Sequence, residues 1–413
     1  MFSTAHTTPT EMPDVDGFRR AARGWLSAVT TPRVAGTAIE WNVGEDDVSV
    51  FDSWSREEEA RRVYDGREWE RQRYEAGWGA IAWPTEFGGR GLPELYAIIY
   101  EQEEQRFDTP KRNELFEVTR QMIAPTIARW GTDGQKERFV RALLRTDLLC
   151  CQLFSEPNAG SDLASLTTRA VRDCNDWIIS GQKVWTSGAT SAEWGEAICR
   201  TDHSVPRHSG MTAFLIPMDA PGVTVRPIRQ MTGGSSFSEV FLDDVRVSDN
   251  LRLGPVGAGW KVALTTLAAE RFASQNLGGP TINRVLGLAD HIGARSDRQL
   301  ADEVTDLSIR ATVNSLNGKR VAQSIAAGQD PGPIGSIGRL SATRNMRRTS
   351  DLVSRLLGAK LVADTAEWGT YAWSDQVLGA PGYRIAGGSE EIQKNIIAER
   401  VLGLPREPRV ADS

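Results

Sequence analysis

The spacing of apolar residues changes twice along the 413-residue chain, and this constrains the fold more than any other feature. From about residue 15 to 148, apolar residues recur at helical intervals, most clearly over 55–77 and 93–107. From about 149 to 254, short alternating or apolar runs lie between turn residues, which predicts strands. After residue 258 the helical spacing returns. This order predicts a β domain, either a small sheet or a barrel, between two helical domains.

We therefore expect an α+β multidomain protein with domain limits at 1–148, 149–256 and 257–413. Four strand segments are expected in the middle domain, of which the first alternates around a turn and the second and third are buried: 177–185, 212–217, 223–225 and 238–247. Four helices are expected in the last domain: 260–277, 304–327, 337–357 and 392–402. Residues 328–335 read as a helix–helix loop.

Charge and composition exclude some classes of partner. A net charge of −6 gives no electrostatic reason to expect nucleic acid or an anionic membrane. The apolar runs are shorter than the roughly 18 residues of a membrane span, and Met1 to Asp16 lacks the apolar core of a signal peptide. The cysteines Cys150, Cys151, Cys174 and Cys199 have no metal-ligand spacing, so we expect buried, reduced thiols in a cytoplasmic protein.

Several catalytic motifs are missing from the sequence. It contains no GxGxxG opening a βαβ unit, no Walker A loop, no GxSxG and no HExxH. The four histidines are scattered, and His203 and His208 are expected in one exposed loop. Rossmann-type nicotinamide binding, Ser–His hydrolysis and metal catalysis therefore lack support, and no metal site is expected.

Four sequence blocks and a connector, in register along nearly the whole chain, resemble the acyl-CoA dehydrogenase family. The blocks are Gln152 to Asp162 (QLFSEPNAGSD), Ile179 to Gly188 (ISGQKVWTSG), Ser238 to Val247 leading to Gly257–Trp260, and Gly387 to Lys394 (GGSEEIQK), with the connector Gly77 to Gly91. The resemblance implies an oxidoreductase whose C-terminal domain is a four-helix bundle and whose cofactor is FAD.

A flavin needs hydrogen-bond donors at its polar edge and a wall against one ring face. By the resemblance, Ser155 and Ser187 contact the flavin and Trp185 packs near its ring. The alternative reading is that both serines cap turns and that Trp185 belongs to the core. The other residues expected at the cofactor are Gln152, Phe154, Gly160, Ser161, Ser389 and Glu391. Ser161 is also expected at the thioester arm of the substrate.

The base that removes the α proton is expected at Glu270. Many family members carry a glutamate in a Tyr-Glu-Gly-Thr segment, but here Gly387 occupies that position. The family's second location, a helix position just before an arginine, holds Glu270 followed by Arg271, which is expected to bind substrate. Burial would raise the pKa of Glu270 toward the working pH; the alternative is an ion pair on a solvated face. The backbone N–H of Gly387 can still donate to the thioester carbonyl.

Two departures concern the adenine half of FAD. The Arg-x-x-Phe-Gly and Gln-x-x-Gly-Gly motifs of the family have only remnants here, at 293–298 and 355–359. A partner subunit is therefore expected to complete that half-site. The tail 398–406 is similar to actinobacterial members, some of which act on steroid side chains as two-subunit heteromers.

The function expected is trans-α,β-dehydrogenation of an acyl-CoA in lipid, fatty-acid or steroid degradation, with electrons passed to an electron-transfer flavoprotein. The assembly expected is a homodimer or tetramer, or a heteromer with a paralogue. Two alternatives remain open: an oxygen-using flavin oxidase of the same fold, and a non-catalytic subunit of a heteromeric dehydrogenase. The acyl group, and CoA against a carrier-protein thioester, depend on cavity residues that are distant in sequence.

Overall fold

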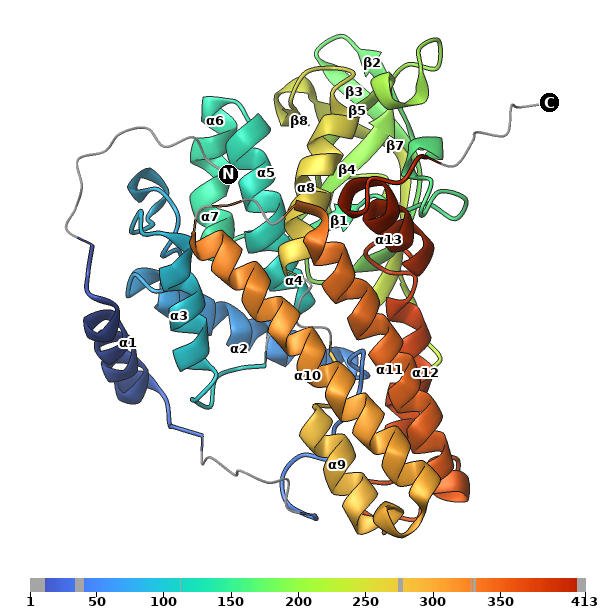
Figure 1. Ribbon diagram of the computed structural model, residues 1–413. Coiled ribbons are helices and arrows are strands. Elements are labelled where there is room, and N and C mark those ends of the chain that lie inside the picture. Colours follow the sequence, from blue (N-terminus) through green and yellow to red (C-terminus); the bar gives the residue numbers. More distant parts are fainter. Residues whose placement is uncertain are drawn as a thin grey trace.

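The computed structural model describes the chain apart from residues 1–11, 34–40, 112, 274–277, 328, 330–331 and 407–413, and apart from the side chains of 269–273 and 325–326. Helices come first, strands follow, and helices return (Figure 1). The predicted order of helical, β and helical regions is confirmed. The exact domain limits stay a prediction.

The N-terminal region is helical and leads to the first strand. Its elements are α1 (Val15–Val29), α2 (Arg56–Glu75), α3 (Glu94–Glu104), α4 (Glu114–Glu117), α5 (Ala124–Trp130), α6 (Asp133–Gln135) and α7 (Arg141–Leu144), with π-helical turns η2 (Val118–Ile123) and η3 (Lys136–Val140). Helix α2 begins where the predicted periodic segment does, because the Ser55 side chain accepts from the Glu58 N–H and three glutamates occupy the first turn.

The middle region forms one mixed sheet. Its strands are β1 (Cys150–Leu153), β2 (Arg169–Asp173), β3 (Asp176–Ser187), β4 (Trp194–Arg200), β5 (Met211–Pro217), β6 (Val223–Ile228), β7 (Phe237–Ser248) and β8 (Arg252–Leu253). They run in the order β6-β7-β3-β2-β4-β5-β8, and β1 pairs in parallel with β4. The strands gather at the upper right of Figure 1, beside α8.

Two strand predictions need correction. The segment 177–185 does not alternate around a turn, because Gly181 lies inside the continuous strand β3 and causes a register shift against β7. Strand β6 is not buried, since it pairs only with β7 at the edge of the sheet and alternates half-buried with exposed residues. The prediction of buried strands holds for β5, whose first six residues are all buried.

The C-terminal region forms the helical bundle. Its elements are α8 (Gly259–Ala273), α9 (Ile282–His291), α10 (Arg298–Ala326), α11 (Gly335–Leu357), α12 (Trp373–Tyr383) and α13 (Glu390–Ile396), which runs into the π-helical turn η10 (Ile397–Val401). The long helices α10 and α11 cross the front of Figure 1, and α13 lies at its upper right. Part of the predicted 328–335 loop lies outside the described residues.

One hydrophobic core runs through all three regions. It joins Ile123 and Ile127 of the first region to Phe154 and Ile198 of the sheet and to Val262 of α8. The first residue of helix α8 is in close contact with the sheet, because a Cβ added to Gly259 would lie 2.6 Å from the Thr212 nitrogen. The Gly257 N–H also donates to Thr212 Oγ1 at 3.1 Å. The position of α8 is therefore fixed by the middle sheet.

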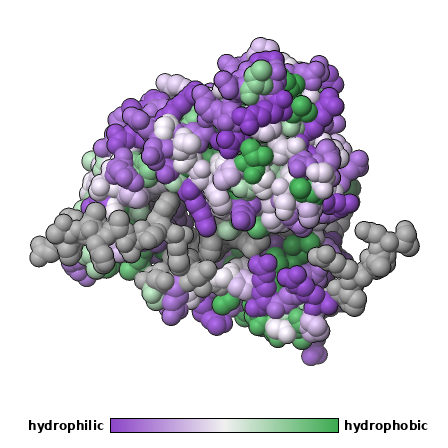
Figure 2. Space-filling model, turned by 90° about the horizontal axis from the view of Figure 1, so that it is seen from above, coloured by the Kyte–Doolittle hydropathy of each residue, from purple (hydrophilic) through white to green (hydrophobic). Residues whose placement is uncertain are grey.

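The surface bears on three smaller predictions. The face shown in Figure 2 is mainly hydrophilic, with small separate apolar areas. Among the described residues, no helix has the length and apolar character needed to cross a bilayer. Cys150, Cys151 and Cys199 are buried and reduced, whereas Cys174 is exposed, which corrects the prediction for that thiol. His203 and His208 are both exposed, as predicted.

Candidate functional site

The predicted flavin-contact residues of the middle domain meet where β1 ends beside β3. The Val184 N–H donates to the Ser155 carbonyl at 2.9 Å, so the residues after β1 run along β3. Ser187 pairs with Phe237 of β7 at the end of the same strand. The structure therefore brings Phe154, Ser155 and Ser187 to the end of β3 that lies beside the end of β1, here called the β1–β3 edge, and Phe154 is buried there.

Trp185 stands out within this edge. Its backbone is left-handed, with φ of 60°, and the β3–β7 register shifts between Lys183 and Thr186. A left-handed residue other than glycine costs about 1–2 kcal/mol. Its side chain is 58% exposed and touches Phe237, with ring centroids 6.2 Å apart. Since strained residues cluster where a ligand binds, this conformation favours a binding role over the alternative that Trp185 is core.

Gln152 supplies the test of whether the site fits a flavin. Its side-chain Nε2 is buried, and no described residue accepts a hydrogen bond from it. A buried donor without an acceptor is rare and needs an explanation. A bound group with carbonyl or ring-nitrogen acceptors would satisfy it, and the pyrimidine edge of a flavin carries such acceptors. With Ser155 and Ser187 at the same end of these strands, the residues present fit the group.

The turn that carries Gly160 and Ser161 is anchored through Glu156. Its carboxylate accepts from the Lys183 ammonium at 2.8 Å and from the N–H groups of Thr167 and Thr168. Burial would raise the pKa of Glu156, but Lys183 and these hydrogen bonds lower it to about 2. Gly160 and Ser161 themselves are exposed, at the rim of the site.

The predicted C-terminal residues lie between α12 and α13. Gly387 has φ of 60°, and the Gln393 side-chain amide donates to the carbonyls of Gly387 and Gly388 at 3.2 Å each. The Ser389 oxygen caps α13, accepting from the Ile392 N–H at 3.4 Å. Glu391 is exposed. In the described part of the chain, no hydrogen bond joins this segment to β1 or β3.

Glu270 and Arg271 fall in the last turn of α8, but their side chains lie outside the described residues. The helix as a whole packs on the sheet through Val262 and Ala263. The base assignment therefore stays a prediction.

Glu114 was not singled out by any motif. It bonds to the Ser187 side chain; burial and the nearby Asp52 raise its pKa, and the Ser187 bond lowers it in part. The residue is nevertheless exposed, which fits a carboxyl that water reaches but protein surrounds on most sides. Only the fold, by placing α4 beside the end of β3, makes it a candidate.

An aromatic row continues from this point toward α12. Phe237 meets Phe51 edge-on, with ring centroids 5.3 Å apart, and Phe51 stacks on Tyr383 at 4.7 Å. Burial and the Glu114 carboxylate raise the pKa of Tyr383, so its phenol stays protonated. Apolar ring faces and polar groups thus lie side by side at the junction of all three regions.

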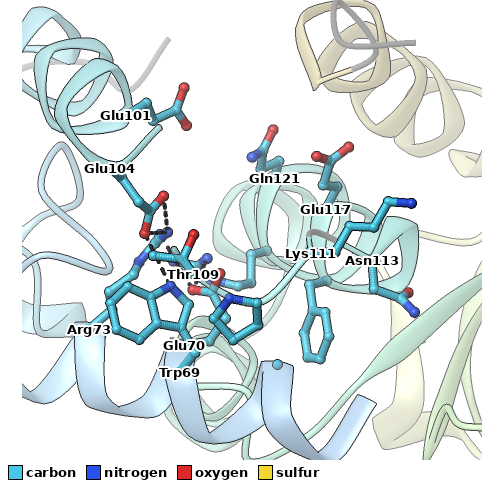
Figure 3. A pocket seen from close by; sticks show the side chains of 14 residues that line it. Trp69, Glu70, Arg73, Glu101, Glu104, Thr109, Lys111, Asn113, Glu117 and Gln121 are labelled. Carbon is cyan, nitrogen blue, oxygen red and sulfur yellow. Dashed lines mark hydrogen bonds and ion pairs between the residues drawn. The ribbon is translucent and has the colours of Figure 1, made fainter. Parts of the chain in front are cut away.

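A separate hollow lies among α2, α3 and η2 (Figure 3). Its volume is about 40 Å³, room for a few water molecules. Arg73 Nη1 donates to Glu104 at 2.9 Å and Trp69 Nε1 donates to the same carboxylate at 3.1 Å, as the dashed lines in Figure 3 show. None of the predicted site residues lines it. We interpret it as a structural ion-pair network.

The remnants of the adenine motifs are occupied by internal ion pairs. Arg295 binds Asp290 at 2.7 Å, and Arg355 binds Glu303. Both arginines are exposed and bound to carboxylates of the same chain. The structure gives no separate sign of an adenine site at 293–298 or 355–359.

Comparison with known proteins places this geometry in a family. Models of the N-terminal, middle and C-terminal domains of acyl-CoA dehydrogenases match residues 47–147, 151–245 and 257–402. The acyl-CoA dehydrogenase IpdE1 of Mycobacterium tuberculosis is 34% identical over 409 residues, covering 96% of this chain and all of that protein. FadE34 of the same organism is 38% identical over 403 residues, but the chain spans only 54% of its length.

Solved structures agree with this assignment. The ChsE4–ChsE5 complex from Mycobacterium tuberculosis superposes with a TM-score of 0.71 at 26% identity, covering 97% of this chain and 100% of the other. A chain described as the Tcur3481–Tcur3483 steroid acyl-CoA dehydrogenase gives 0.73 at 25% identity, covering 95% and 98%. With three matching domains in order and relatives above 30% identity along the whole chain, the protein belongs to the acyl-CoA dehydrogenase family.

Proposed function

We propose that this chain catalyses FAD-dependent trans-α,β-dehydrogenation of an acyl-CoA thioester from lipid or steroid degradation. The observation that carries the proposal is the β1–β3 edge, where strained, exposed Trp185 and the unsatisfied amide of Gln152 lie beside Ser155 and Ser187. Members of the family are flavoproteins. FAD bound there would accept the hydride that leaves the β carbon.

The residues of the chain have separate tasks in this proposal. Gln152, Ser155 and Ser187 hold the polar edge of the flavin, and Trp185 covers a ring face. Glu270 takes the α proton, and the Gly387 N–H donates to the thioester carbonyl, which stabilises the negative charge that develops on its oxygen. The left-handed Gly387 backbone is held by Gln393, so this donor is oriented before substrate arrives.

The remaining predicted contacts are at the rim and on α13. Gly160 and Ser161 let the backbone approach the thioester arm, Arg271 binds the substrate, and Ser389 and Glu391 face the flavin from the start of α13. Phe154 closes the cavity from the core side.

The proposed electron acceptor is an electron-transfer flavoprotein, and the proposed assembly is a heteromer with a paralogous chain. Two solved relatives are described as two-component assemblies, and FadE34 is nearly twice the length of this chain. A second chain of the same fold would supply the adenine half-site whose motifs are reduced here. A non-catalytic role for this chain within such a heteromer is the second candidate, favoured by the internal ion pairs of Arg295 and Arg355.

The visible spectrum of the purified chain tests the proposal, before and after anaerobic addition of fatty, branched and steroid acyl-CoAs. A flavin spectrum bleached by one of them is expected. Bleaching followed by rapid reoxidation in air would favour the oxidase alternative. A colourless chain that takes up FAD only with a paralogue, and whose Glu270→Gln form leaves that complex fully active, would identify the non-catalytic subunit.

A further inference from the structure

A buried carboxyl at the meeting point of all three regions has no part in the function proposed above. Glu196 of β4, Thr266 of α8 and Thr126 of α5 are each fully buried. Thr266 Oγ1 lies 3.0 and 3.1 Å from the two carboxyl oxygens of Glu196 and 2.9 Å from Thr126 Oγ1. Thr126 Oγ1 lies 2.8 Å from the Met122 carbonyl oxygen.

Counting hydrogens shows which state of Glu196 this chain of contacts favours. The links Glu196–Thr266, Thr266–Thr126 and Thr126–Met122 need three hydrogens, but the two threonine hydroxyls supply only two. A longer contact of Thr266 Oγ1 with the Val262 carbonyl, at 3.4 Å, competes for one of these two. The Met122 carbonyl can only accept. A protonated Glu196 supplies the third hydrogen: it donates to Thr266, Thr266 donates to Thr126, and Thr126 donates to Met122. With an ionised Glu196, one of the three links has no hydrogen.

The electrostatic surroundings favour the same state. In the part of the chain that the structure describes, no basic side chain forms an ion pair with Glu196. Burial raises the pKa of Glu196 to about 8, and the Thr266 bond lowers it in part. The titratable group facing it is the Cys150 thiol of β1, whose own pKa burial raises. Lys261 on α8 and Arg129 on α5 are exposed. Gln152, the cross-strand neighbour of Glu196, is neutral.

We infer that Glu196 is a positioning residue: as a neutral, hydrogen-donating carboxyl it fixes helix α8 against β4 and α5, and so sets the place of Glu270 one helical turn after Thr266. Its neighbour Gln152 stands at the proposed flavin edge, so one buried link holds the base-bearing helix and the flavin-contact strand in register. The part that concerns Glu270 rests on the proposed function; the tie between the three regions does not.

Loss of the proton would weaken this link. An ionised Glu196 can only accept, so the Thr266 hydroxyl must turn to it. The Thr126 hydroxyl can then donate either to Thr266 or to the Met122 carbonyl, so one of these two contacts loses its hydrogen. Because the native pKa is raised above that of the unfolded chain, the native state binds more protons between about pH 4.5 and 8, and its stability falls across that window as pH rises.

The test compares the wild-type chain with Glu196→Gln and Thr126→Val at pH values from 5 to about 9.5. Glutamine keeps a donor to Thr266 but cannot ionise, so its melting temperature should lose the fall between about pH 4.5 and 8. Amide exchange of α8, corrected for the intrinsic pH effect, should speed up about tenfold more in the wild type above pH 8 than in Glu196→Gln. In Thr126→Val the Thr266 hydroxyl no longer bonds to Thr126 and can donate to the Glu196 carboxylate. The fall in melting temperature with rising pH should therefore begin at lower pH than in the wild type.

Parallel curves for the wild type and Glu196→Gln in melting temperature and α8 exchange would overturn the inference. The inference would also be overturned if the melting temperature of Thr126→Val fell over the same pH range as that of the wild type. This second comparison keeps the test decisive if Glu196→Gln does not fold. Melting temperature and amide exchange are measured without acyl-CoA. If no acyl-CoA bleaches the flavin, the proposed function is contradicted, but these two measurements still test the role of Glu196. With an active substrate, the rate of flavin bleaching should fall above pH 8 in the wild type only; an equal fall in Glu196→Gln would reduce Glu196 to a structural role.

Discussion

At the scale of single residues, the proposed chemistry depends on which carboxyl reaches the substrate. The usual base position is Gly387, which leaves Glu270 of α8 and the unforeseen Glu114 beside Ser187 as the acidic candidates. The pKa of Glu114 is raised, but its carboxyl bonds to a hydroxyl proposed to face the flavin. We keep Glu270 as the proposed base and propose that Glu114 forms part of the wall of the acyl-group site.

Glu270→Gln should retain FAD and lose at least ~100-fold in turnover, the scale of a lost general base. Glu114→Gln is the matched control, since it makes the same chemical change at the other carboxyl. We expect it to alter KM and the choice of acyl group more than kcat. Steady-state kinetics on both variants checks this, and near-normal turnover in Glu270→Gln with loss in Glu114→Gln would reverse the assignment.

Trp185→Phe should weaken FAD binding with little loss of stability. The side chain is 58% exposed and contacts one ring, so its truncation removes little packing from the chain alone. Flavin fluorescence titration gives the affinity and thermal unfolding of the apoprotein gives the stability. A large fall in melting temperature with unchanged FAD affinity would show that Trp185 is core after all.

At the scale of elements, the sequence predicted the type of each helix and strand better than the contacts that these elements make with one another. The strongest helical segments and the strand 238–247 were found because their apolar spacing is long and regular. Gly181 was read as part of a turn, but it lies at a bulge inside β3. The pairing of β3 with β7 determines this conformation, and no local sequence pattern reveals that pairing. The role of Glu114 could not be predicted, because it depends on α4 and β3 meeting across more than seventy residues of chain.

Gly259→Ala should weaken the docking of α8. The new Cβ would lie 2.6 Å from the Thr212 nitrogen. Since that backbone atom is held in the sheet and cannot move aside without strain, we expect the free energy of unfolding to fall by about 1–3 kcal/mol. Gly318→Ala, inside α10 with nothing near its Cβ, is the control and should be neutral or stabilising. Chemical denaturation measures both; equal effects would mean that α8 is not held at Gly259.

Lys183→Met should destabilise the Glu156 turn, because it leaves a buried carboxylate without its cation, at a cost of about 3–5 kcal/mol. In the wild type the depressed pKa of Glu156 stabilises the fold above about pH 4.5, and this is lost as pH falls toward 2. Melting temperatures between pH 6 and 3 should therefore fall more steeply in the wild type than in Lys183→Met. Arg246→Met, which breaks two exposed ion pairs, with Asp173 and Asp176, should leave the melting curve almost unchanged.

At the scale of the whole molecule, the three matched domains share one core. The two segments expected to bind the adenine half of FAD, in contrast, have their arginines engaged within the chain. Arg295 and Arg355 are bound by carboxylates of their own chain. The proposed remedy is a second chain of the same fold; two solved relatives are described as two-component assemblies.

A tagged chain expressed in its native host should copurify with such a paralogue at equal stoichiometry, and with more FAD per chain than when expressed alone. Light scattering combined with flavin absorbance measures both quantities. A homo-oligomer of this chain that carries one FAD per subunit would contradict the heteromer.

The continuous core also bears on how chains like this one can change during evolution. A gene segment that encodes only one of the three regions cannot be exchanged freely, because its inner face is shaped to Ile127, Ile198 and Val262 of the others. The smallest piece that can be copied without exposing this face is the entire chain. Tandem duplication of whole genes, followed by divergence of the copies, is therefore the route to new members that this architecture leaves open.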